Sequence, residues 1–453
     1  MNEGVHELPH QVVPAVVPMK VDQEANLDFK LSDNRTQEKH KHNMTSIQMD
    51  TESLHEVAFG DDMGQKELCL RPQSVFLNHG SYGVVPRRVL DVQKRLMDER
   101  ENHPDHWFRR VARGYWLEAR TAAAEFVGAD VDDVVFVSNA TTAVNVVLRS
   151  LKLEAGDAIL ATTLTFRSFQ TLWEDLQERI YPRGVQCLLM EIKMPILSED
   201  QVVQQYDEFL ASHPNVKFVL IDHITSPSTI LMPVERLIPV CHKHGALVMI
   251  DGAHAPGQVK LKLNMLGADM YTGNFHKWLF TPRGCALLWV SKDHHHLVNP
   301  VNTPWRKKQS LGDQFFYQGT QDHIPLICAK YGVQFYQAIG GMERIIRYKS
   351  KLTTEGCDYL VKKLDLTSLA IPPSMESPNL RFLKLPRIPS GFGNKTNQVD
   401  VQCLEQDIYQ NHDIQTIFDF LDGALYLRIS VHIYNTMDDF VRLASVLKKY
   451  LDQ

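Results

Sequence analysis

The sequence lacks the features that would place it in a membrane or direct it out of the cell. None of its apolar runs approaches the roughly 20 residues that a helix needs to cross a bilayer. Its first residues lack a basic stretch followed by an apolar one, the pattern of a secretory signal, and they are acidic and poor in Arg, unlike a mitochondrial address. We therefore expect a cytoplasmic protein without a membrane contact.

Cysteine clusters and basic stripes are also missing. The seven cysteines are scattered without a C-x-x-C pair, so we expect reduced thiols and no metal site. The three histidines at 294–296 lack the i, i+4 spacing of a metal site, and a solvated loop is the favoured interpretation. The formal net charge of -6, without a dominant basic stripe, argues against nucleic acid as a partner.

Composition divides the chain into a polar beginning and a structured remainder. Residues 1–65 contain few aromatics and no sustained hydrophobic period, and we expect a disordered leader there. Between about 130 and 300, short apolar runs alternate with helical patterns, which predicts an α/β fold with a mostly parallel sheet and helices on both faces. We expect a large domain over 66–335 and a smaller α+β domain over 336–453.

Three polar features fall at the ends of predicted strands or the starts of helices, the edge where α/β sheets bind ligands. The stretch "SNATTAVN" at 138–145 opens a helix and suits an anion such as phosphate, although plain helix capping is the commoner role of such residues. Asp251 ends an apolar strand, where it would form a cap or an ion pair, or hold the proton of a heteroaromatic ring nitrogen. Lys277 lies among aromatic residues. Most lysines are surface residues, but an apolar surround lowers the pKa of an amine, and a neutral amine forms Schiff bases.

A phosphate site, an acid for a ring nitrogen and an imine-forming lysine are together what pyridoxal 5'-phosphate requires. The sequence resembles the fold-type I pyridoxal-phosphate enzymes of the class V aminotransferase group, in particular the isopenicillin N epimerase-like and cysteine desulfhydrase-like branch. The resemblance implies a large cofactor-binding domain with a seven-stranded, mostly parallel sheet between helices, and a smaller α+β domain after it. It covers about residues 74–450 and rests on seven motifs in the family's order: "NHGSYG" (78–83), "NATTAVN" (139–145), "DHITSPS" (222–228), "DGAHAPG" (251–257), "TGNFHKW" (272–278), "YQGTQD" (317–322) and "LRISVHIYNT" (427–436).

The resemblance also implies how the cofactor is held. Lys277 would form the Schiff base and move the α-proton, Asp251 would pair with the pyridinium nitrogen, and His254 would lie near the phenolic oxygen. Gly319 and Thr320 would reach the phosphate of a neighbouring subunit, which predicts a homodimer with shared sites. The other implied cofactor residues are Thr142, Ala143, Asn274 and His276 at the phosphate, and Ser226 near a cofactor oxygen and the substrate carboxylate.

The same resemblance implies the substrate-binding residues. Arg428 would clamp the carboxylate of an amino-acid substrate, a task suited to the planar fork of a guanidinium. Gly80 and Ser81 would line the substrate side.

The sequence departs from the family pattern at the ring stacker and at cysteine. Family members stack His or Tyr on the ring, whereas "TTLTFRSF" offers Phe166, which stacks but cannot exchange a proton. Arg167 or Arg109 would read a second anionic group if it faces the pocket, with a solvent-facing or helix-face position as the alternative. Cys328 and Cys403 lie in apolar or helical contexts, so we interpret both as buried and inert, which argues against a persulfide-forming desulfurase.

We therefore expect a pyridoxal-phosphate enzyme that acts on an L-α-amino acid, with β-elimination from a cysteine-like substrate as the favoured outcome. Epimerisation and transamination are the alternatives, because each begins with loss of the α-proton. A dimeric scaffold without catalysis would not need the full set of polar residues named above. A nucleotide-binding reductase would need a G-x-G-x-x-G after its first strand, and "SNATTAVN" contains no glycine.

Overall fold

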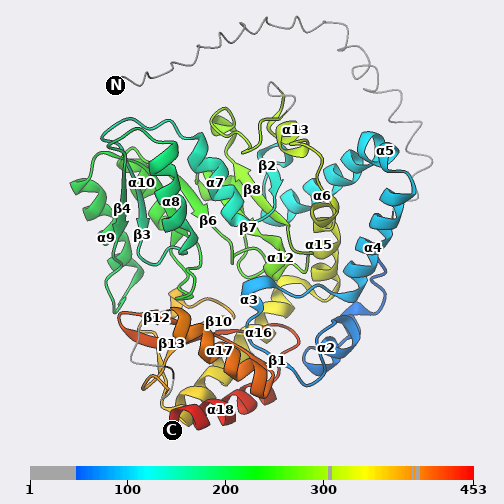
Figure 1. Ribbon diagram of the computed structural model, residues 1–453, viewed down its shortest axis with the longest axis vertical. Helices are drawn as coiled ribbons and strands as arrows, with labels where there is room; N and C mark the ends of the chain where they lie inside the picture. The colour runs from blue at the N-terminus through cyan, green and yellow to red at the C-terminus, as the bar shows by residue number, and fades with distance from the viewer. Residues whose placement is uncertain (1–46, 305–308, 390–391, 393–397, 453) are drawn as a thin grey trace, which may run out of the picture. The chain divides into compact units, whose positions relative to one another are not determined.

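A seven-stranded sheet organises the larger part of the computed structural model, which describes residues 47–304, 309–389, 392 and 398–452 (Figure 1). The strand order is β2-β8-β7-β6-β5-β3-β4, and β8 runs antiparallel to both of its neighbours while the other pairs are parallel. The mostly parallel sheet that the sequence predicts is therefore confirmed. Its strands are β2 (Val134–Val137), β3 (Ala158–Thr162), β4 (Gln186–Met190), β5 (Val216–Asp222), β6 (Leu247–Asp251), β7 (Met270–Asn274) and β8 (Ala286–Val290).

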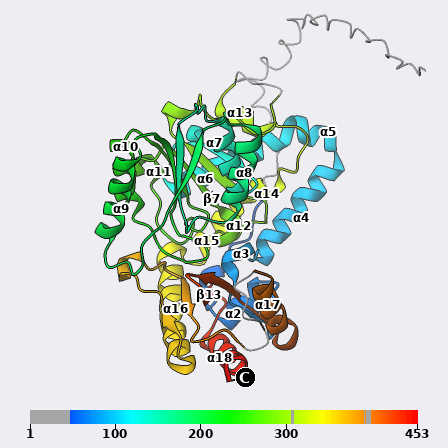
Figure 2. The ribbon, with the colours of Figure 1, turned by 60° about the vertical axis from the view of Figure 1, so that its left-hand side comes forward.

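Most strands of this sheet are apolar at successive positions because helices cover both faces. On one face, apolar residues of β2, β5 and β8 pack in one core with α7 (Ala140–Ser150) and α8 (Ser168–Arg179). Figure 2 shows α9 (Glu199–Ser212) and α10 (Val234–Lys243) on the other side of the sheet. Among the described helices, none is long and apolar enough to cross a membrane.

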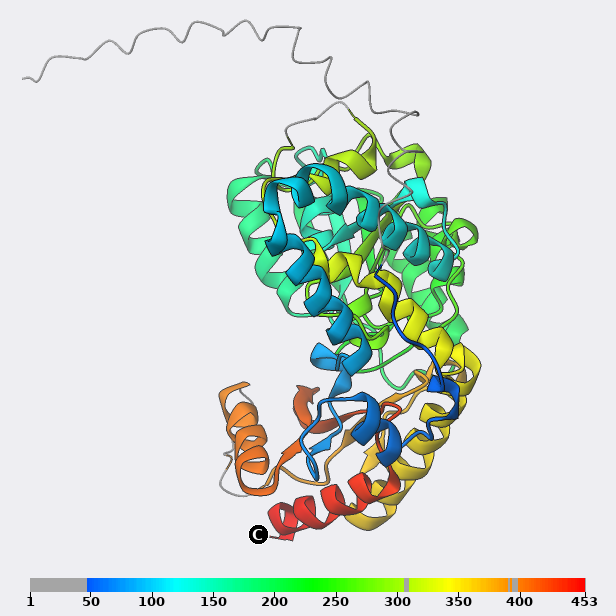
Figure 3. The same ribbon diagram turned by 90° about the vertical axis from the view of Figure 1, so that its right-hand side faces the viewer.

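A smaller antiparallel sheet forms the C-terminal part, in the order β12-β13-β10-β9. One hydrophobic core joins this sheet to three helices. In Figure 3 the long yellow helix α16 extends from the larger part to the red helix α18. The expected smaller α+β part is therefore confirmed. Its elements are α16 (Gly341–Leu364), β9 (Thr367–Ser368), β10 (Leu380–Lys384), α17 (Gln398–His412), β12 (Ile417–Leu421), β13 (Ala424–Ser430) and α18 (Met437–Asp452).

The described N-terminal residues correct the expected leader. Residues 47–65 contain the helical turn η3 (Leu54–Glu56) and the start of α2 (Asp61–Glu67), where Leu54 and Met63 are fully buried. The N–H of Gly60 donates a hydrogen bond of 2.7 Å to a carbonyl of the C-terminal part. A few buried apolar side chains attach this segment to the folded protein, so its polar average composition wrongly predicts disorder. The expectation for residues 1–46 concerns residues outside those described.

A short N-terminal strand belongs with the smaller part. β1 (Val75–Phe76) pairs in parallel with β11 (Ile414–Gln415), and Val75 and Leu77 lie in the hydrophobic core of the smaller part. The expected large domain of 66–335 includes this strand, so its N-terminal boundary is corrected here. The apolar run "SVFL" indicates a strand, but strand pairing is non-local, so the run does not reveal its partner.

Candidate active site

The polar residues singled out in the sequence meet at the carboxyl edge of the large sheet. β6 ends at Asp251, and β7 ends at Asn274, immediately before α12 (Phe275–Trp278), which carries Lys277. The strand register places Asp251 beside Thr272 of β7. Parallel strands bring their carboxyl ends to one edge, so residues distant in the chain become neighbours here.

Lys277 has a buried amine with a lowered basicity. Its Nζ lies 3.0 Å from Nε2 of His254. Burial, and next the charge of Arg428, lower the pKa of Lys277 from 10.5 to about 7, while Asp251 acts in the opposite direction. At neutral pH a large share of this amine is unprotonated, and the neutral form is the nucleophile that condenses with an aldehyde.

His254 is a neutral imidazole with one unsatisfied nitrogen. Burial lowers its pKa well below 6.5, and the neighbouring charges of Lys277 and Arg428 act in the same direction. Its Nδ1 is buried without a hydrogen-bond partner among the residues that the structure describes. An unpaired buried polar atom is costly, and a polar ligand bound in this pocket would satisfy it.

Two carboxyl groups lie side by side at the strand ends. Asp222 of β5 is in register with Asp251 of β6. Burial raises the pKa of both groups, and for Asp222 the adjacent Asp251 is the next cause. Oδ1 of Asp251 accepts a hydrogen bond of 2.9 Å from the N–H of Ala253, whereas Oδ2 of Asp222 has no partner in the described part of the chain. Two adjacent buried carboxylates repel each other, so Asp222 is the group held protonated next to Asp251.

The start of α7 is capped from two directions. The side chain of Asn139 accepts from the N–H of Thr142 at 2.8 Å, and Oδ1 of Asn274 accepts from the N–H of Ala140 at 2.9 Å. The N–H of Ala143 donates to the carbonyl of Asn139 at 3.2 Å. The capping interpretation of "SNATTAVN" is thus realised in the structure, and a phosphate at Thr142 would replace the Asn139 side chain. The phosphate roles of Thr142 and Ala143 remain predictions.

Phe166 reaches the same pocket as Asp251. A small pocket is lined by Asp251, Thr141, Thr165 and Phe166, and the Phe166 side chain is exposed. Thr141, which the sequence reasoning did not single out, follows the cap at the start of α7 and was hidden among similar hydroxyl residues. The shared pocket is consistent with a ring between Phe166 and the strand ends.

His276 is neutral and oriented by the backbone. Its Nδ1 lies 2.9 Å from the carbonyl of Cys285, so that nitrogen carries the proton and donates it. Burial lowers the pKa of His276 to about 4. The imidazole therefore presents its other nitrogen as an acceptor, and its predicted place beside a phosphate would need a proton to be taken up.

Arg428 is a buried guanidinium held by neutral oxygen atoms. It donates to Asn78 Oδ1 at 2.7 Å, to Ser81 Oγ at 2.8 Å and to Ser226 Oγ at 3.2 Å. Burial lowers the pKa of Arg428 from 12.5 to about 10, and its Nε has no hydrogen-bond partner among the described residues. A buried cation without a direct carboxylate partner favours an incoming carboxylate.

The glycine before Ser81 allows the chain to approach the lysine helix. A Cβ at Gly80 would lie 3.1 Å from the Trp278 ring and 3.3 Å from the His254 ring. The predicted residues Gly80, Ser81, Ser226 and Arg428 are therefore assembled near Lys277. Asn78 also belongs to this group, and its place in the quoted motif "NHGSYG" was the signal that could have identified it.

Gly319 and Thr320 are not brought to this group by the single chain. Both are exposed, and no atom of the described residues lies within 4 Å of where a Gly319 side chain would begin. The positive φ of 112° at Gly319 favours glycine at this position. Their predicted contact with a neighbouring subunit remains a prediction.

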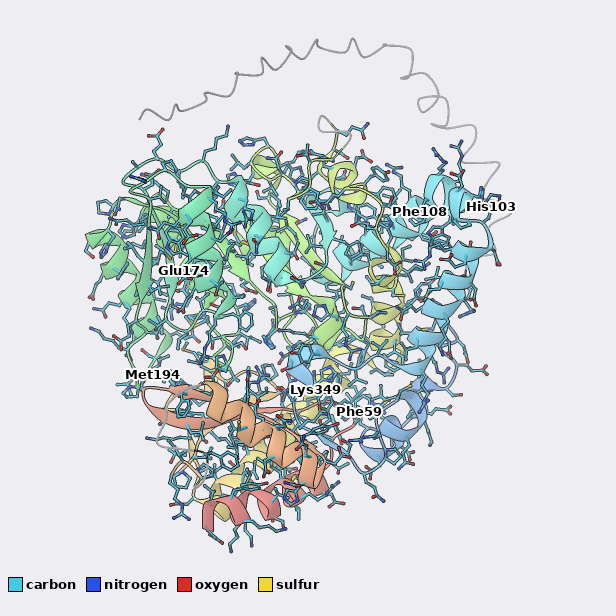
Figure 4. The ribbon with its side chains drawn as sticks, viewed as in Figure 1. Phe59, His103, Phe108, Glu174, Met194 and Lys349 are labelled. Carbon is cyan, nitrogen blue, oxygen red and sulfur yellow. The ribbon has the colours of Figure 1, made fainter. Side chains whose placement is uncertain are left out.

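A cluster of buried basic side chains next to α12, formed by His79, His432 and Lys349, was not identified from the sequence. Nε2 of His79 donates to the carbonyl of Lys277 at 2.5 Å, and its ring lies 3.8 Å from the ring of His432. Lys349 of α16, labelled in Figure 4, is fully buried with its Nζ 5.0 Å from the Trp278 ring centre. Burial lowers the pKa of Lys349 to about 7. Lys349 lies on the buried face of α16, four residues after Ile345 and three before Leu352, and this helical spacing was the signal that could have identified it.

Several predictions about single side chains are corrected or decided. Arg109 is exposed on its helix and pairs with Asp105 at 2.7 Å, which is the helix-face alternative.

Cys328 is buried, and burial raises its thiol pKa well above 9, but Cys403 is exposed, so the expected burial of Cys403 is wrong. The side chain at 403 faces away from the buried residues at 401, 404 and 408, a helical spacing that would have revealed it.

The histidines at 294–296 are not a freely solvated loop. His294 Nε2 lies 2.8 Å from a carboxylate oxygen of Asp269, and His295 Nε2 lies 3.0 Å from Asp133. Both side chains are half-buried. In the described part of the chain, no cluster of three His, Cys, Asp or Glu residues is arranged to hold a metal ion.

Comparison with solved structures identifies the class of fold. The structure resembles a complex between the cystine C-S lyase C-DES and its reaction product cysteine persulfide, with a TM-score of 0.71 and 18% identity, over 84% of this chain and 98% of the other. The family model described as "Aminotransferase class-V" matches residues 84–443. The chain belongs to the class V aminotransferase family, and the resemblance drawn from its motifs is confirmed.

Three curated relatives cover most of the chain at similar identity. Hercynylcysteine sulfoxide lyase of Schizosaccharomyces pombe is 26% identical, over 86% of this chain and 98% of the relative. L-cysteine desulfhydrase of Arabidopsis thaliana is 26% identical, over 82% and 86%. Isopenicillin N epimerase of Streptomyces clavuligerus is also 26% identical, over 84% and 96%. Lyases and an epimerase are thus equally distant relatives.

The protein is a pyridoxal-phosphate-dependent enzyme, and the site fits this cofactor. A buried amine of lowered pKa is available for the aldehyde, and an acid lies on the same sheet edge for the ring nitrogen. The unpaired Nδ1 of His254 offers a hydrogen-bonding atom for a polar substituent of the ring. These features agree with the chemistry of the cofactor independently of the family match.

Proposed function

We propose that the protein is a lyase that removes a sulfur substituent from the β-carbon of an L-cysteine-like substrate. The observation that carries this proposal is the placement of the buried amine of Lys277 near Arg428, a buried guanidinium whose hydrogen-bond partners among the described residues are all neutral. One group is suited to take a proton and the other to hold a carboxylate. The lyase and desulfhydrase names among the relatives support the outcome.

Each residue of the site has a defined task in this reaction. Arg428, supported by Ser81 and Ser226, binds the substrate carboxylate and orients the α-carbon. Lys277, neutral near pH 7, takes the α-proton, and Asp251 holds a proton on the ring nitrogen. When bound, the cofactor supplies an electron sink for the charge that proton loss leaves on the α-carbon.

Asp222 keeps the pair of strand-end carboxyl groups at a single negative charge. When Asp222 is protonated, Asp251 can be ionised beside a cationic ring without a second buried negative charge next to it. The Thr165 side chain and the Phe166 N–H donate hydrogen bonds to Asp222. Asp222 would therefore act on Asp251 through its own charge state.

A symmetric homodimer in the cytoplasm is part of the proposal. Gly319 and Thr320 lie exposed on the single chain, where a second copy can reach them. In the dimer they would complete the phosphate site of the partner. Size-exclusion chromatography with light scattering tests this, and a monomer that retains full activity would contradict it.

Epimerisation of an amino acid is the second candidate. It is favoured by the epimerase relative and needs only that the proton return to the other face of the α-carbon. Phe166 lines the pocket at the site but cannot deliver that proton. The second acid or base that epimerisation requires is therefore missing at this position, which favours elimination.

The test uses the purified holoenzyme and a panel of L-amino acids. Sulfide or thiol, pyruvate and exchange of the α-proton with deuterated water are measured in parallel. Elimination releases thiol and pyruvate, whereas exchange with inversion and no pyruvate would establish the epimerase instead. If the purified protein has no visible absorbance band, or has a band that borohydride does not bleach, both candidate functions are excluded.

The matched control for the catalytic lysine is a surface lysine. Lys277→Ala should remove both the band and the activity. Lys243→Ala changes an exposed lysine paired with Asp207, and it should leave both intact.

A further inference from the structure

We propose that His79 is a positioning residue of the candidate active site: its imidazole fixes the main chain at Lys277, and through it the direction of the amine. This inference rests on the proposed function, which assigns the reactive amine to Lys277. His79 begins α3 (His79–Tyr82), a single helical turn. Its contact with Lys277 is made to the backbone, so it acts through the lysine and not on a substrate.

The helix that carries the lysine is too short to orient itself. α12 has four residues, and the N–H of Leu279 closes its turn on the carbonyl of Phe275 at 3.0 Å. The last carbonyls of a helix have no partner within the helix. In a helix of one turn they include the carbonyl of Lys277, so the orientation of this residue depends on groups outside the helix.

His79 supplies the missing donor in a defined tautomer. Its Nε2 lies 2.5 Å from the carbonyl of Lys277, which can only accept, so Nε2 carries the proton. Its Nδ1 lies 3.1 Å from the hydroxyl of Tyr434 and accepts from it. Burial is the leading cause that lowers the pKa of His79 to about 3. The ring is therefore neutral and keeps this arrangement at physiological pH.

Packing holds the ring of His79 in place. The residue is fully buried, and its ring centre lies 3.8 Å from that of His432 and 5.0 Å from that of Trp278. The rings of His432 and Tyr434 are nearly parallel, with an angle of 8° between them. A satisfied hydrogen-bond chain in a region of low dielectric constant is rigid. The donor to Lys277 is therefore oriented before any ligand binds.

Two glycines allow neighbouring turns to close around α12. A Cβ at Gly83 would lie 1.9 Å from the carbonyl oxygen of His276, and one at Gly257 would lie 2.7 Å from that of Trp278. Both glycines have a positive φ, which other residues rarely adopt. The carbonyls on either side of Lys277 are thus enclosed by backbone, and that of Lys277 is held by a side chain.

The turn that carries His79 also holds the carboxylate clamp. Asn78 and Ser81 accept hydrogen bonds from Arg428 at 2.7 and 2.8 Å, and Ser81 donates to Asn78 at 2.8 Å. One turn therefore sets the proton-accepting amine and the clamp relative to each other. A misplacement of about 1 Å between such groups can lower a rate roughly 10²-fold.

The test compares two amides that differ in reach. His79→Gln keeps an N–H donor near the position of Nε2, whereas the donor of His79→Asn is one methylene shorter and ends near the position of Nδ1. Both replacements are neutral and polar. A general loss of packing would affect the two variants alike, and only a role of the Nε2 donor separates them.

Formation of the visible band on the apoprotein is the first measurement, and it needs no substrate. Pyridoxal 5'-phosphate is added, and the band that borohydride bleaches is followed over time. We expect the rate constant to fall roughly tenfold in His79→Asn and to stay within about threefold of the native value in His79→Gln. Peptide mapping after reduction should locate the cofactor on Lys277 in the native protein and in His79→Gln.

Release of tritium from the α-carbon of S-methyl-L-cysteine by the holoenzyme separates the amine from the clamp. Elimination, epimerisation and transamination all begin with this proton loss. In His79→Asn, kcat should fall roughly ten- to hundredfold, while KM should change less than about threefold because Arg428 keeps its contact with Ser81. A rise in KM as large as the loss in kcat would show that the whole turn has moved, and it would overturn the specific role.

Two further variants control for folding and for the type of contact. Tyr434→Phe keeps the ring but removes the hydroxyl that fixes the tautomer, and it should lower the rate of band formation roughly two- to fivefold. If His79→Asn does not fold, a native rate in Tyr434→Phe overturns the role. His213→Asn changes a histidine at the end of α9 whose Nδ1 lies 2.8 Å from the carbonyl of Phe209, and it should alter neither measurement.

The outcomes separate this inference from the proposed function. Equal rates of band formation in His79→Asn and His79→Gln, or an equal loss in His213→Asn, would overturn the positioning role alone. A Lys277→Ala variant that keeps the bleachable band would refute both. No release of tritium by the native holoenzyme would refute the proposed function on this substrate, while band formation would still decide the role of His79.

Discussion

The two ends of the candidate active site are built in opposite ways. At the sheet edge, Lys277, His254 and Asp251 are enclosed, and burial is the leading cause of the pKa shift of each. At the small sheet, Arg167 and Asp419 remain in contact with solvent and pair directly. The comparison teaches that desolvation shifts the basicity of the enclosed groups, whereas the ion pair at the small sheet stays in contact with water.

The largest expected effect comes from the enclosed end. Lys277→Ala should lower kcat/KM by about 10⁴-fold, since it removes both the attachment point and the base. The same variant should not shift the melting temperature of the apoprotein downward by more than a few degrees, because a buried charge-bearing group is removed. Steady-state kinetics and calorimetry check both statements. Retention of more than a tenth of the activity would show that another group is the base.

Removal of the clamp is the next largest effect. Arg428→Gln should lower kcat/KM by about 10²- to 10³-fold, because the substrate carboxylate would lose a buried charged partner. Arg428→Lys serves as the matched variant, since it keeps the charge but lacks the planar fork, and it should be intermediate. If both variants raise KM less than threefold, the carboxylate binds elsewhere.

A third prediction concerns the stability of the protein and Lys349, the buried lysine of α16. Lys349→Met should stabilise the apoprotein by up to about 4 kcal/mol at pH 7, because the buried amine has no hydrogen-bond partner among the described residues and its pKa is lowered from 10.5 to about 7. Lys351→Met, on the exposed face of the same helix, is the control and should change stability little.

The pH dependence of that third effect has a definite sign. Between pH 7 and 10.5 the unfolded chain binds more protons at Lys349 than the folded one, so the stability of the unmodified protein rises with pH across this window. The advantage of Lys349→Met should therefore be full at pH 7 and below and vanish toward pH 10.5. Denaturant unfolding at several pH values measures it, and a constant difference would disprove the assignment.

The smallest expected effect is at the exposed end. Arg167→Gln and Asp419→Asn should each change the free energy of unfolding by less than about 1 kcal/mol, because exposed ion pairs contribute little. Thermal unfolding measures this. A larger loss would show that the pair holds the two parts of the protein together.

Much of the site was predictable because family motifs carry it in order along the chain. Lys277, Asp251, His254 and Arg428 were predicted and do lie near one another. Asp222 was within a quoted motif but gained significance only through its register with Asp251. His79 was missed because its burial arises from segments distant in sequence, whereas Lys349 was missed although helical spacing from Ile345 places it on the buried face of α16. The exposure of Cys403 was a local signal that helical periodicity contains.

By itself, the sequence determined the alternation of strands and helices, the family and the candidate for the reactive lysine, because these depend on local hydrophobic period and on residue type. The tertiary structure alone decided which carboxyl group neighbours which, that β1 pairs with β11, and that Arg167 meets Asp419 across 252 positions of the chain. Those contacts follow from strand register and from the packing of one part on another. Strand register and packing bring together residues that are far apart in the chain, and they determine how strongly each charged group is removed from water.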